Sequence, residues 1–266
     1  MSDSKIKITA VNYLNTFPFK YALEKFANQV DWAEINYAAP AECAQMLINN
    51  ETNLALAPIA VLAKQPNLNI VTNFCLSTFN EVKSVKLYSK KSIEDIQTIV
   101  LDYQSLSSVS LIKVLMKYYW KKSVRYLQGY KGFENKLSAD AMVVIGDRTF
   151  ELNGKFPYEY DLATEWYRYY GKPFVFAGWI SNVILKDSYL QQLNTIFDYG
   201  LQHLDEVIDY AMQNHSLSGK RLNKEIIADY LTNKMHYRLT NDRKESIEHF
   251  LHLLKKLETE KSVVDF

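Results

Sequence analysis

The sequence alternates short apolar runs with helical patterns over its first two thirds, and this alternation is the feature that most constrains the fold. Strand-like and helical segments in alternation are typical of an α/β protein with a largely parallel sheet. We expect strands at residues 6–11, 54–57, 84–88, 98–101, 142–145 and 174–176. We expect helices at residues 19–26, 41–48, 109–120 and 162–170.

The last part of the chain, roughly 80 residues, changes almost entirely to helical periodicity. Its clearest signal is a stripe of apolar residues at i, i+3, i+4 and i+7, formed by Ile247, Phe250, Leu251 and Leu254. A stripe with this spacing lies on one face of a helix and is typical of packing against a core. We therefore predict a helical tail at the C-terminal end.

Two extended runs, residues 82–88 and 174–185, are candidates for connections between two lobes. With only 8 Gly and 6 Pro, the chain has no flexible linker, so two lobes would be joined by strands. We expect the two runs to pair with each other. The predicted first lobe comprises residues 1–88 and 178–266, with the helical tail, and the second comprises residues 89–177. A cleft between lobes is a usual place for a small ligand.

Composition excludes several classes of partner. Lys and Arg total 31 against 30 Asp and Glu, so there is no positive field to hold nucleic acid or an anionic membrane surface. No run reaches the roughly 20 apolar residues of a spanning helix. The N-terminal segment lacks the hydrophobic core of a signal peptide, so we expect a cytoplasmic protein.

Cysteine and aromatic content add two expectations. Cys43 and Cys75 are the only two cysteines and have no CxxC spacing, which indicates buried free thiols rather than a disulfide framework or a zinc site. Aromatic residues make up 14% of the chain, more than a small core needs for packing. We therefore expect some of the rings to line a cavity.

The strongest candidate for a ligand site follows the strand at residues 98–101. Ser105, Ser107 and Ser108 occupy the turn and the first positions of the next helix. Hydroxyls and free backbone N–H groups at a helix start can bind a carboxylate or phosphate. Simple capping of the helix is the alternative, because serine is a common cap residue.

Two further turns follow apolar strands. Asn15 and Thr16 are good turn and cap residues, yet with Tyr13 they also describe a loop that faces a ligand at the carboxyl end of a strand. In the other turn, Gly146 permits close approach of the backbone. Asp147 and Arg148 could address a ligand or pair with each other, and we favour the ion pair.

Common catalytic motifs are missing from the sequence, including GxSxG, GxGxxG, GxxxxGK[ST] and HExxH. His249 and His252 have helical spacing for a metal, but we interpret them as solvated helix residues. Asp161 and Glu165 are interpreted as residues at a helix start. An active site would then depend on amides, hydroxyls and helix dipoles, which suits a carboxylated ligand.

At these turns the chain resembles the chorismate dehydratase family, the first enzymes of the futalosine route of menaquinone biosynthesis. The similar segments occur in the family's order and span about residues 6 to 185. They are residues 11–18 (VNYLNTFP), 81–85 (EVKSV), 105–109 (SLSSV), 145–147 (IGD), 161–166 (DLATEW) and 171–179 (GKPFVFAGW).

The resemblance implies an α/β, two-lobed fold like the type II periplasmic binding proteins, with a ligand cleft between the lobes. It also implies a reaction, the loss of water from chorismate to give 3-[(1-carboxyvinyl)oxy]benzoate, with no metal and no organic cofactor. The substrate would be a small dicarboxylate. Aromatisation of the ring would drive the reaction.

The resemblance also implies roles for individual residues. Asn15 matches the asparagine at the reacting ring, and Ser84 matches a ligand-binding serine. Ser107 and Ser108 match a Thr-Ser pair that we assign to a substrate carboxylate, in agreement with the helix dipole. Tyr13, Gly146 and Asp147, on the matching turns, complete the predicted substrate-binding set. A carboxamide is not basic, so Asn15 can orient the substrate or hydrogen-bond the leaving hydroxyl but cannot be a general base.

Two alternatives remain at this stage. The first is the sister enzyme, 1,4-dihydroxy-6-naphthoate synthase, but its Ser-Pro-Cys-Pro-Asn-Asp turn is replaced here by residues 12–15 (NYLN), and the earliest histidine is His203. The second is a cytoplasmic solute-binding protein for a small carboxylate, since the fold alone does not distinguish an enzyme from a binder. A homodimer is possible, with Tyr167, Tyr169 and Tyr170 at an interface or at the inter-lobe hinge.

Overall fold

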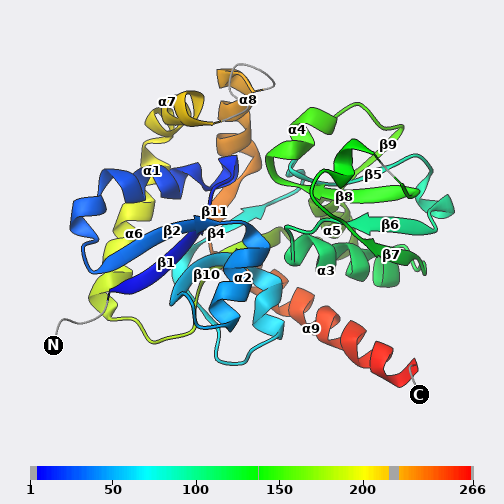
Figure 1. The fold of residues 1–266 in the computed structure, drawn as a ribbon, viewed down its shortest axis with the longest axis horizontal. Coiled ribbons are helices and arrows are strands. Elements are labelled where there is room, and N and C mark those ends of the chain that lie inside the picture. Colours follow the sequence, from blue (N-terminus) through cyan, green and yellow to red (C-terminus); the bar gives the residue numbers. More distant parts are fainter. Residues whose placement is uncertain (1–4, 137, 216–221, 265–266) are drawn as a thin grey trace.

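The computed structural model describes residues 5–136, 138–215 and 222–264. They form two β-sheets with helices packed on their faces, one sheet in each of two lobes (Figure 1). The predicted two-lobed α/β architecture is therefore confirmed. No helix among the described residues is both long enough and apolar enough to cross a membrane.

The first sheet has six strands, in which parallel and antiparallel pairs are mixed. The prediction of a largely parallel sheet is therefore wrong. The strands are β1 (Ile6–Val11), β2 (Ala33–Ala38), β3 (Leu54–Pro58), β4 (Asn69–Thr78), β10 (Phe174–Ser181) and β11 (His236–Arg238). Their order in the sheet is β11-β4-β10-β3-β1-β2. β1 runs parallel to β2 and β3, whereas β10 runs antiparallel to β3 and β4.

Helices cover this sheet and bury its aromatic residues. They are α1 (Phe17–Lys25), α2 (Pro40–Ile48), α6 (Asp187–Gln202), α7 (Leu204–Asn214) and α8 (Lys224–Asp229). α1 and α2 both have proline in the first turn, where its missing N–H costs no hydrogen bond. Phe19 of α1 packs edge-on against Trp179 of β10, with ring centroids 5.8 Å apart. A Cβ on Gly200 would lie 2.0 Å from the carbonyl oxygen of Pro18, so glycine allows α6 to touch α1.

The second sheet has five strands. They are β5 (Val85–Ser89), β6 (Thr98–Leu101), β7 (Arg125–Gln128), β8 (Ala141–Ile145) and β9 (Tyr158–Asp161), in the order β7-β6-β8-β5-β9. Its helices are α3 (Ser107–Val114), which continues into a π-helical turn, α4 (Thr149–Leu152) and α5 (Leu162–Tyr170). α9 (Asn241–Val264) packs against β10 of the first lobe and α3 of the second, and thus connects the two (Figure 1).

The predicted pairing between residues 82–88 and 174–185 is wrong. β5 lies between β8 and β9, so both of its edges are hydrogen-bonded inside the second sheet. Because a strand has only two edges, none remains for β10. β10 instead pairs with the end of β4, where Phe174 lies opposite Thr78. The division of the lobes at residues 88 and 178 stays a prediction.

All six predicted strands are present, as are the four predicted helices, with boundaries that differ by a few residues. Five strands were not predicted: β2, β4, β7, β9 and β11. The last of these interrupts the tail that was expected to be almost entirely helical.

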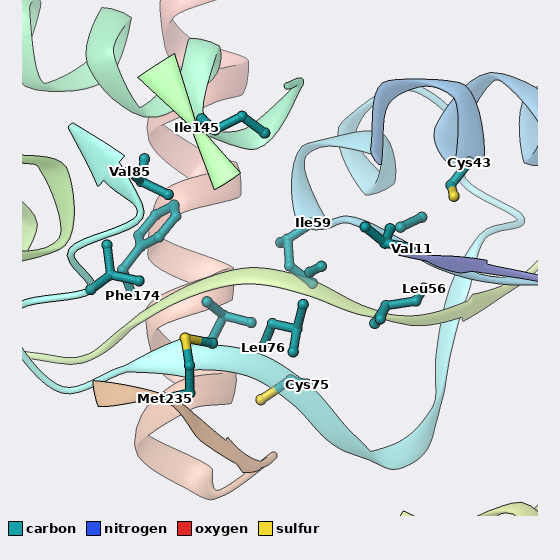
Figure 2. Close-up of a cluster of buried hydrophobic side chains, with 14 of the residues drawn as sticks. Val11, Cys43, Leu56, Ile59, Cys75, Leu76, Val85, Ile145, Phe174 and Met235 are labelled. Atoms are coloured by element: carbon teal, nitrogen blue, oxygen red, sulfur yellow. The ribbon is translucent and has the colours of Figure 1, made fainter. Parts of the chain in front are cut away.

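The lobes meet across a continuous apolar cluster. Val85 and Ile145 of the second sheet belong to the same buried cluster as Leu76 and Phe174 of the first (Figure 2). This shared core means that the ends of strands from both sheets converge on one place. Figure 2 also includes Cys43 and Cys75, which are buried free thiols as predicted.

Candidate active site

A pocket of about 510 Å³, including the part open to solvent, lies where the two lobes meet. It is lined by Val11, Tyr13, Asn15, Pro40, Pro58, Leu76, Val82, Ser84, Val85, Ser105, Ser107, Ser108, Ile145, Gly146, Phe176 and Ala177. Among these residues there is no Asp, Glu, Lys, Arg or His. Its polar groups are therefore neutral. Tyr13 and Phe176 are the aromatic residues in this lining, and most other rings pack in the core.

Six of the seven predicted site residues line this pocket. The turn after β1 contributes Tyr13 and Asn15, and it is closed by Thr16, whose hydroxyl donates to the carbonyl oxygen of Val11 at 2.6 Å. The amide oxygen Oδ1 of Asn15 is buried and has no hydrogen-bond partner among the described residues. A buried amide oxygen without a partner is costly, so Asn15 offers an acceptor to a ligand.

Tyr13 connects the lobes as well as lining the pocket. Its hydroxyl donates to Oε1 of Gln104, in the second lobe, at 3.0 Å. Burial raises the pKa of Tyr13 above its ordinary value, so its phenol stays protonated at neutral pH. The ring lies against Gly146, where a Cβ would be 2.9 Å from Cε2 of Tyr13. Gly146 also has a φ of +69°, so both its space and its conformation require glycine.

The start of α3 shows both features expected from the sequence, a serine that caps the helix and hydroxyls at a ligand pocket. Oγ of Ser105 accepts the N–H of Ser108 at 3.0 Å, so Ser105 caps the helix. Oγ of Ser107 accepts the N–H of Ala60 from the first lobe at 3.2 Å. All three serines line the pocket at a helix N-terminus, where the dipole favours an anion.

Asp147 does not line the pocket but lies behind its wall. The predicted ion pair between Asp147 and Arg148 is wrong. The carboxylate of Asp147 accepts the N–H of Leu14 at 3.3 Å and lies 2.8 Å from Nε2 of His215. Asp147 thus joins the second lobe to two segments of the first. Arg148 instead contacts Asp102 and Glu134. Residues 146–148 form a 3-10 turn, in which adjacent side chains point in different directions, so Asp147 and Arg148 do not face each other.

Arg148, Asp102 and Glu134 form what we call the charged network. Nη2 of Arg148 lies 2.7 Å from Oδ2 of Asp102, whose side chain is 0% exposed, and Nη1 lies 3.2 Å from Glu134. Asp102 also accepts the N–H groups of Ile145 and Gln104, both at 2.9 Å. Burial raises the pKa of Asp102, and Arg148 opposes that shift. The cation is thus already paired with two carboxylates.

Ser84 and Tyr230 form, with Asn15, what we call the neutral network. The hydroxyl of Tyr230, a fully buried residue, donates to Oγ of Ser84 at 2.6 Å. Burial raises the pKa of Tyr230, and the nearby side chains of Ser84 and Asn15 oppose that shift. Sequence reasoning missed Tyr230, because it lies 146 positions from Ser84 in the helical tail and belongs to no motif.

The remaining candidates have structural roles. Asp161 caps α5, as predicted, by accepting the N–H groups of Ala163 and Thr164. His249 is not simply solvated, because it stacks on Tyr170 with ring centroids 3.9 Å apart. In the part of the chain that the structure describes, no group of three or more His, Cys, Asp or Glu side chains could bind a metal ion.

The chain is similar to known proteins in sequence and in fold. A family model described as menaquinone biosynthesis matches residues 6–256. A chorismate dehydratase of Thermus thermophilus is 27% identical over 188 residues, which is 61% of this chain and 69% of that protein.

Solved structures are similar over almost the whole chain. A protein from Archaeoglobus fulgidus superposes with a TM-score of 0.73 at 14% identity, covering 99% of this chain and all of that one. The periplasmic aliphatic sulphonate binding protein of Escherichia coli has a TM-score of 0.61 at 12% identity, covering 98% of this chain and 89% of its own. A Candida albicans protein with the generic periplasmic binding protein fold has a TM-score of 0.63 at 13% identity, covering 96% and 90%. These structures confirm the predicted periplasmic-binding-protein-like fold.

Proposed function

The chain belongs to the menaquinone biosynthesis family, and from this we propose that it is a carbon–oxygen lyase that removes water from chorismate. The product would be 3-[(1-carboxyvinyl)oxy]benzoate. The proposal is supported by the similarity to a chorismate dehydratase over 188 residues. The observation that carries it is the pocket, whose lining groups are neutral hydrogen-bond donors and acceptors.

A pocket of this kind can bind an anion without a cationic side chain. Ser107 and Ser108 lie at the N-terminus of α3, where hydroxyls and the helix dipole stabilise a carboxylate. The apolar lining, which includes Leu76 and Phe176, would cover the faces of the ring. A small dicarboxylate held there would have its reacting carbon atoms near the turn that carries Asn15.

The proposed reaction needs no redox step. A ring C–H bond breaks and its electron pair forms the last double bond of the aromatic ring, while the C–O bond to the hydroxyl breaks. The released proton and the hydroxide leave as water. Since the lining has no basic side chain, we propose that a carboxylate of the substrate itself accepts the proton. Asn15 and Ser84 would hydrogen-bond to the departing hydroxyl.

The direct test is to mix the purified protein with chorismate, without added metal or cofactor, and to follow ultraviolet absorbance and mass for the loss of one water. We expect turnover, and we expect Asn15→Ala to lower kcat about 100-fold, as loss of one pre-oriented polar group in an active site does. Asn12→Ala is the matched control, because Asn12 is an exposed residue of the same turn that bonds to Lys20.

Tight binding of chorismate with no product would contradict the proposed function and would instead indicate a solute-binding protein. Full activity of Asn15→Ala would contradict the role given to Asn15 and would leave the proposed reaction in place.

A further inference from the structure

The hydroxyl of Tyr230 has one hydrogen, so it can donate a hydrogen bond to one neighbouring group. The hydroxyl donates to Oγ of Ser84 at 2.6 Å. Tyr230 is 1% exposed and its ring packs edge-on against Phe150, with centroids 5.2 Å apart and planes at 87°. Burial and this contact hold the phenol oxygen beside Ser84. A phenol is more acidic than an alkyl hydroxyl, so Tyr230 is the donor of this pair and Ser84 is the acceptor.

This bond determines what Ser84 can do. Oγ of Ser84 accepts from Tyr230, so its own hydrogen must point elsewhere. Ser84 is 1% exposed and lines the pocket. Among the described residues its hydroxyl donates to no protein group, so the pocket is the direction left for its hydrogen. Ser84 thus faces the ligand as a donor.

The same hydroxyl determines the orientation of Asn15. With the hydrogen of Tyr230 directed to Ser84, the phenol oxygen is left as an acceptor, so the group of Asn15 that can pair with it is the NH₂ group. Burial raises the pKa of Tyr230, and the neighbouring Ser84 and Asn15 both oppose that shift. Oδ1 of Asn15 is then the atom left without a partner, in agreement with its state in the structure. Asn15 thus faces the ligand as an acceptor.

We propose that Tyr230 is a positioning residue that orients Asn15 as an acceptor and Ser84 as a donor toward the substrate's ring hydroxyl. A hydroxyl is both a donor and an acceptor, so it satisfies the two groups at once. As the C–O bond breaks, the donor would stabilise the charge that develops on the oxygen. This inference rests on the proposed function and assigns a task to a residue outside the predicted site.

The first test is kinetic. Tyr230→Phe should lower kcat with chorismate about 10- to 100-fold and change KM less than about threefold, because the ligand still fits but its hydroxyl is misoriented. Tyr237→Phe is the matched control, since Tyr237 is also buried and its hydroxyl has no hydrogen-bond partner among the described residues. That control should keep the activity of the unaltered protein.

Combining variants distinguishes a positioning role of Tyr230 from a merely structural one. In an Asn15→Ala background, Tyr230→Phe should cost less in kcat than it does in the unaltered protein, because one of the two groups that it orients is gone. Equal losses in both backgrounds would overturn the proposal. So would wild-type kinetics of Tyr230→Phe. Melting temperatures of both tyrosine variants check that each is folded.

Binding of two simple probes keeps this inference separate from the proposed reaction. 4-Hydroxybenzoate carries a hydroxyl opposite its carboxylate, as chorismate does, and benzoate lacks it. Calorimetry should show about tenfold tighter binding of the hydroxylated probe, a preference that Tyr230→Phe loses. If the unaltered protein shows this preference but no turnover of chorismate, the proposed function fails and the positioning role stands. If Tyr230→Phe keeps the preference, the positioning role fails.

Discussion

The neutral network and the charged network differ in what compensates their polar groups and in whether they line the pocket. In the charged network, Asp102 accepts three hydrogen bonds and Arg148 contacts two carboxylates. Nη1 of Arg148 and Oε2 of Glu134 have no hydrogen-bond partner among the described residues, but neither residue lines the pocket. Asn15 and Ser84 do line it, and Oδ1 of Asn15 has no partner among the described residues. The charges are therefore compensated within the protein, whereas the neutral groups are the ones that a ligand in the pocket can reach.

This difference has a physical cause. A buried charge is costly unless it is paired and hydrogen-bonded, so an ionised group near a closed pocket is satisfied by the protein itself. A neutral amide or hydroxyl costs less free energy when it lacks a hydrogen-bond partner, so it can stay unpaired until a ligand binds. We infer that the charged network stabilises the folded protein and the neutral network acts on the substrate.

The largest expected effect tests the charged network. Arg148→Met keeps most of the apolar stem but leaves Asp102, whose side chain is 0% exposed, without its cation. We expect a loss of about 3–5 kcal/mol in the free energy of unfolding, measured with urea at pH 7. The loss should shrink as the pH falls, because burial raises the pKa of Asp102 and protonation removes the unpaired charge.

The control for that variant is an exposed ion pair. Lys224 and Asp209 have side chains that are 61% and 58% exposed. Lys224→Ala should leave the free energy of unfolding almost unchanged, since water screens the pair. Equal losses in the two variants would contradict the stabilising role of the charged network.

The neutral network should show the reverse pattern. Ser84→Ala removes the proposed donor and should lower kcat with chorismate about tenfold or more. The free energy of unfolding should fall by about 1–3 kcal/mol, because the buried hydroxyl of Tyr230 loses its acceptor. Activity assays and urea unfolding on the same preparation check both. A variant that unfolds easily but is fully active would remove the contrast between the networks.

The smallest expected effect comes from a charge that is partly exposed. Lys91 and the N–H groups of Gln97 and Thr98 hold the pKa of Asp140 at about 2, below its usual value. Its stabilisation is therefore present above the ordinary pKa and is lost as the pH falls through about 2. Asp140→Asn should cost about 1 kcal/mol at pH 7 after allowance for solvent screening. The variant and the unaltered protein should become equally stable as the pH approaches the lowered pKa of Asp140. Urea unfolding at several pH values would measure this.

The strands and turns that surround the pocket could be predicted because they are local patterns. A buried strand such as β8 is a continuous apolar run, and the turns after β1 and β6 carry cap residues. The missed strands are different. β2 lies at the edge of its sheet and exposes several of its side chains, so its sequence lacks an apolar run.

Long-range partners could not be predicted from local spacing. Arg148 was expected to pair with the adjacent Asp147, but it reaches Asp102, 46 positions away. Tyr230 meets Ser84 only because the chain returns to the first lobe after building the second. In both cases the partner is chosen by the topology of the sheets, which the sequence pattern describes only in outline.

The position of Tyr230 in the chain has a consequence for biosynthesis on the ribosome. The second lobe, from β5 to α5, is complete in sequence before Tyr230 is translated. Domains fold as the chain emerges, at about 5–20 residues per second, so the second lobe can form before the neutral network is complete. The neutral network closes only when Tyr230 arrives, and a nascent chain shorter than this carries Ser84 and Asn15 without the group that orients them.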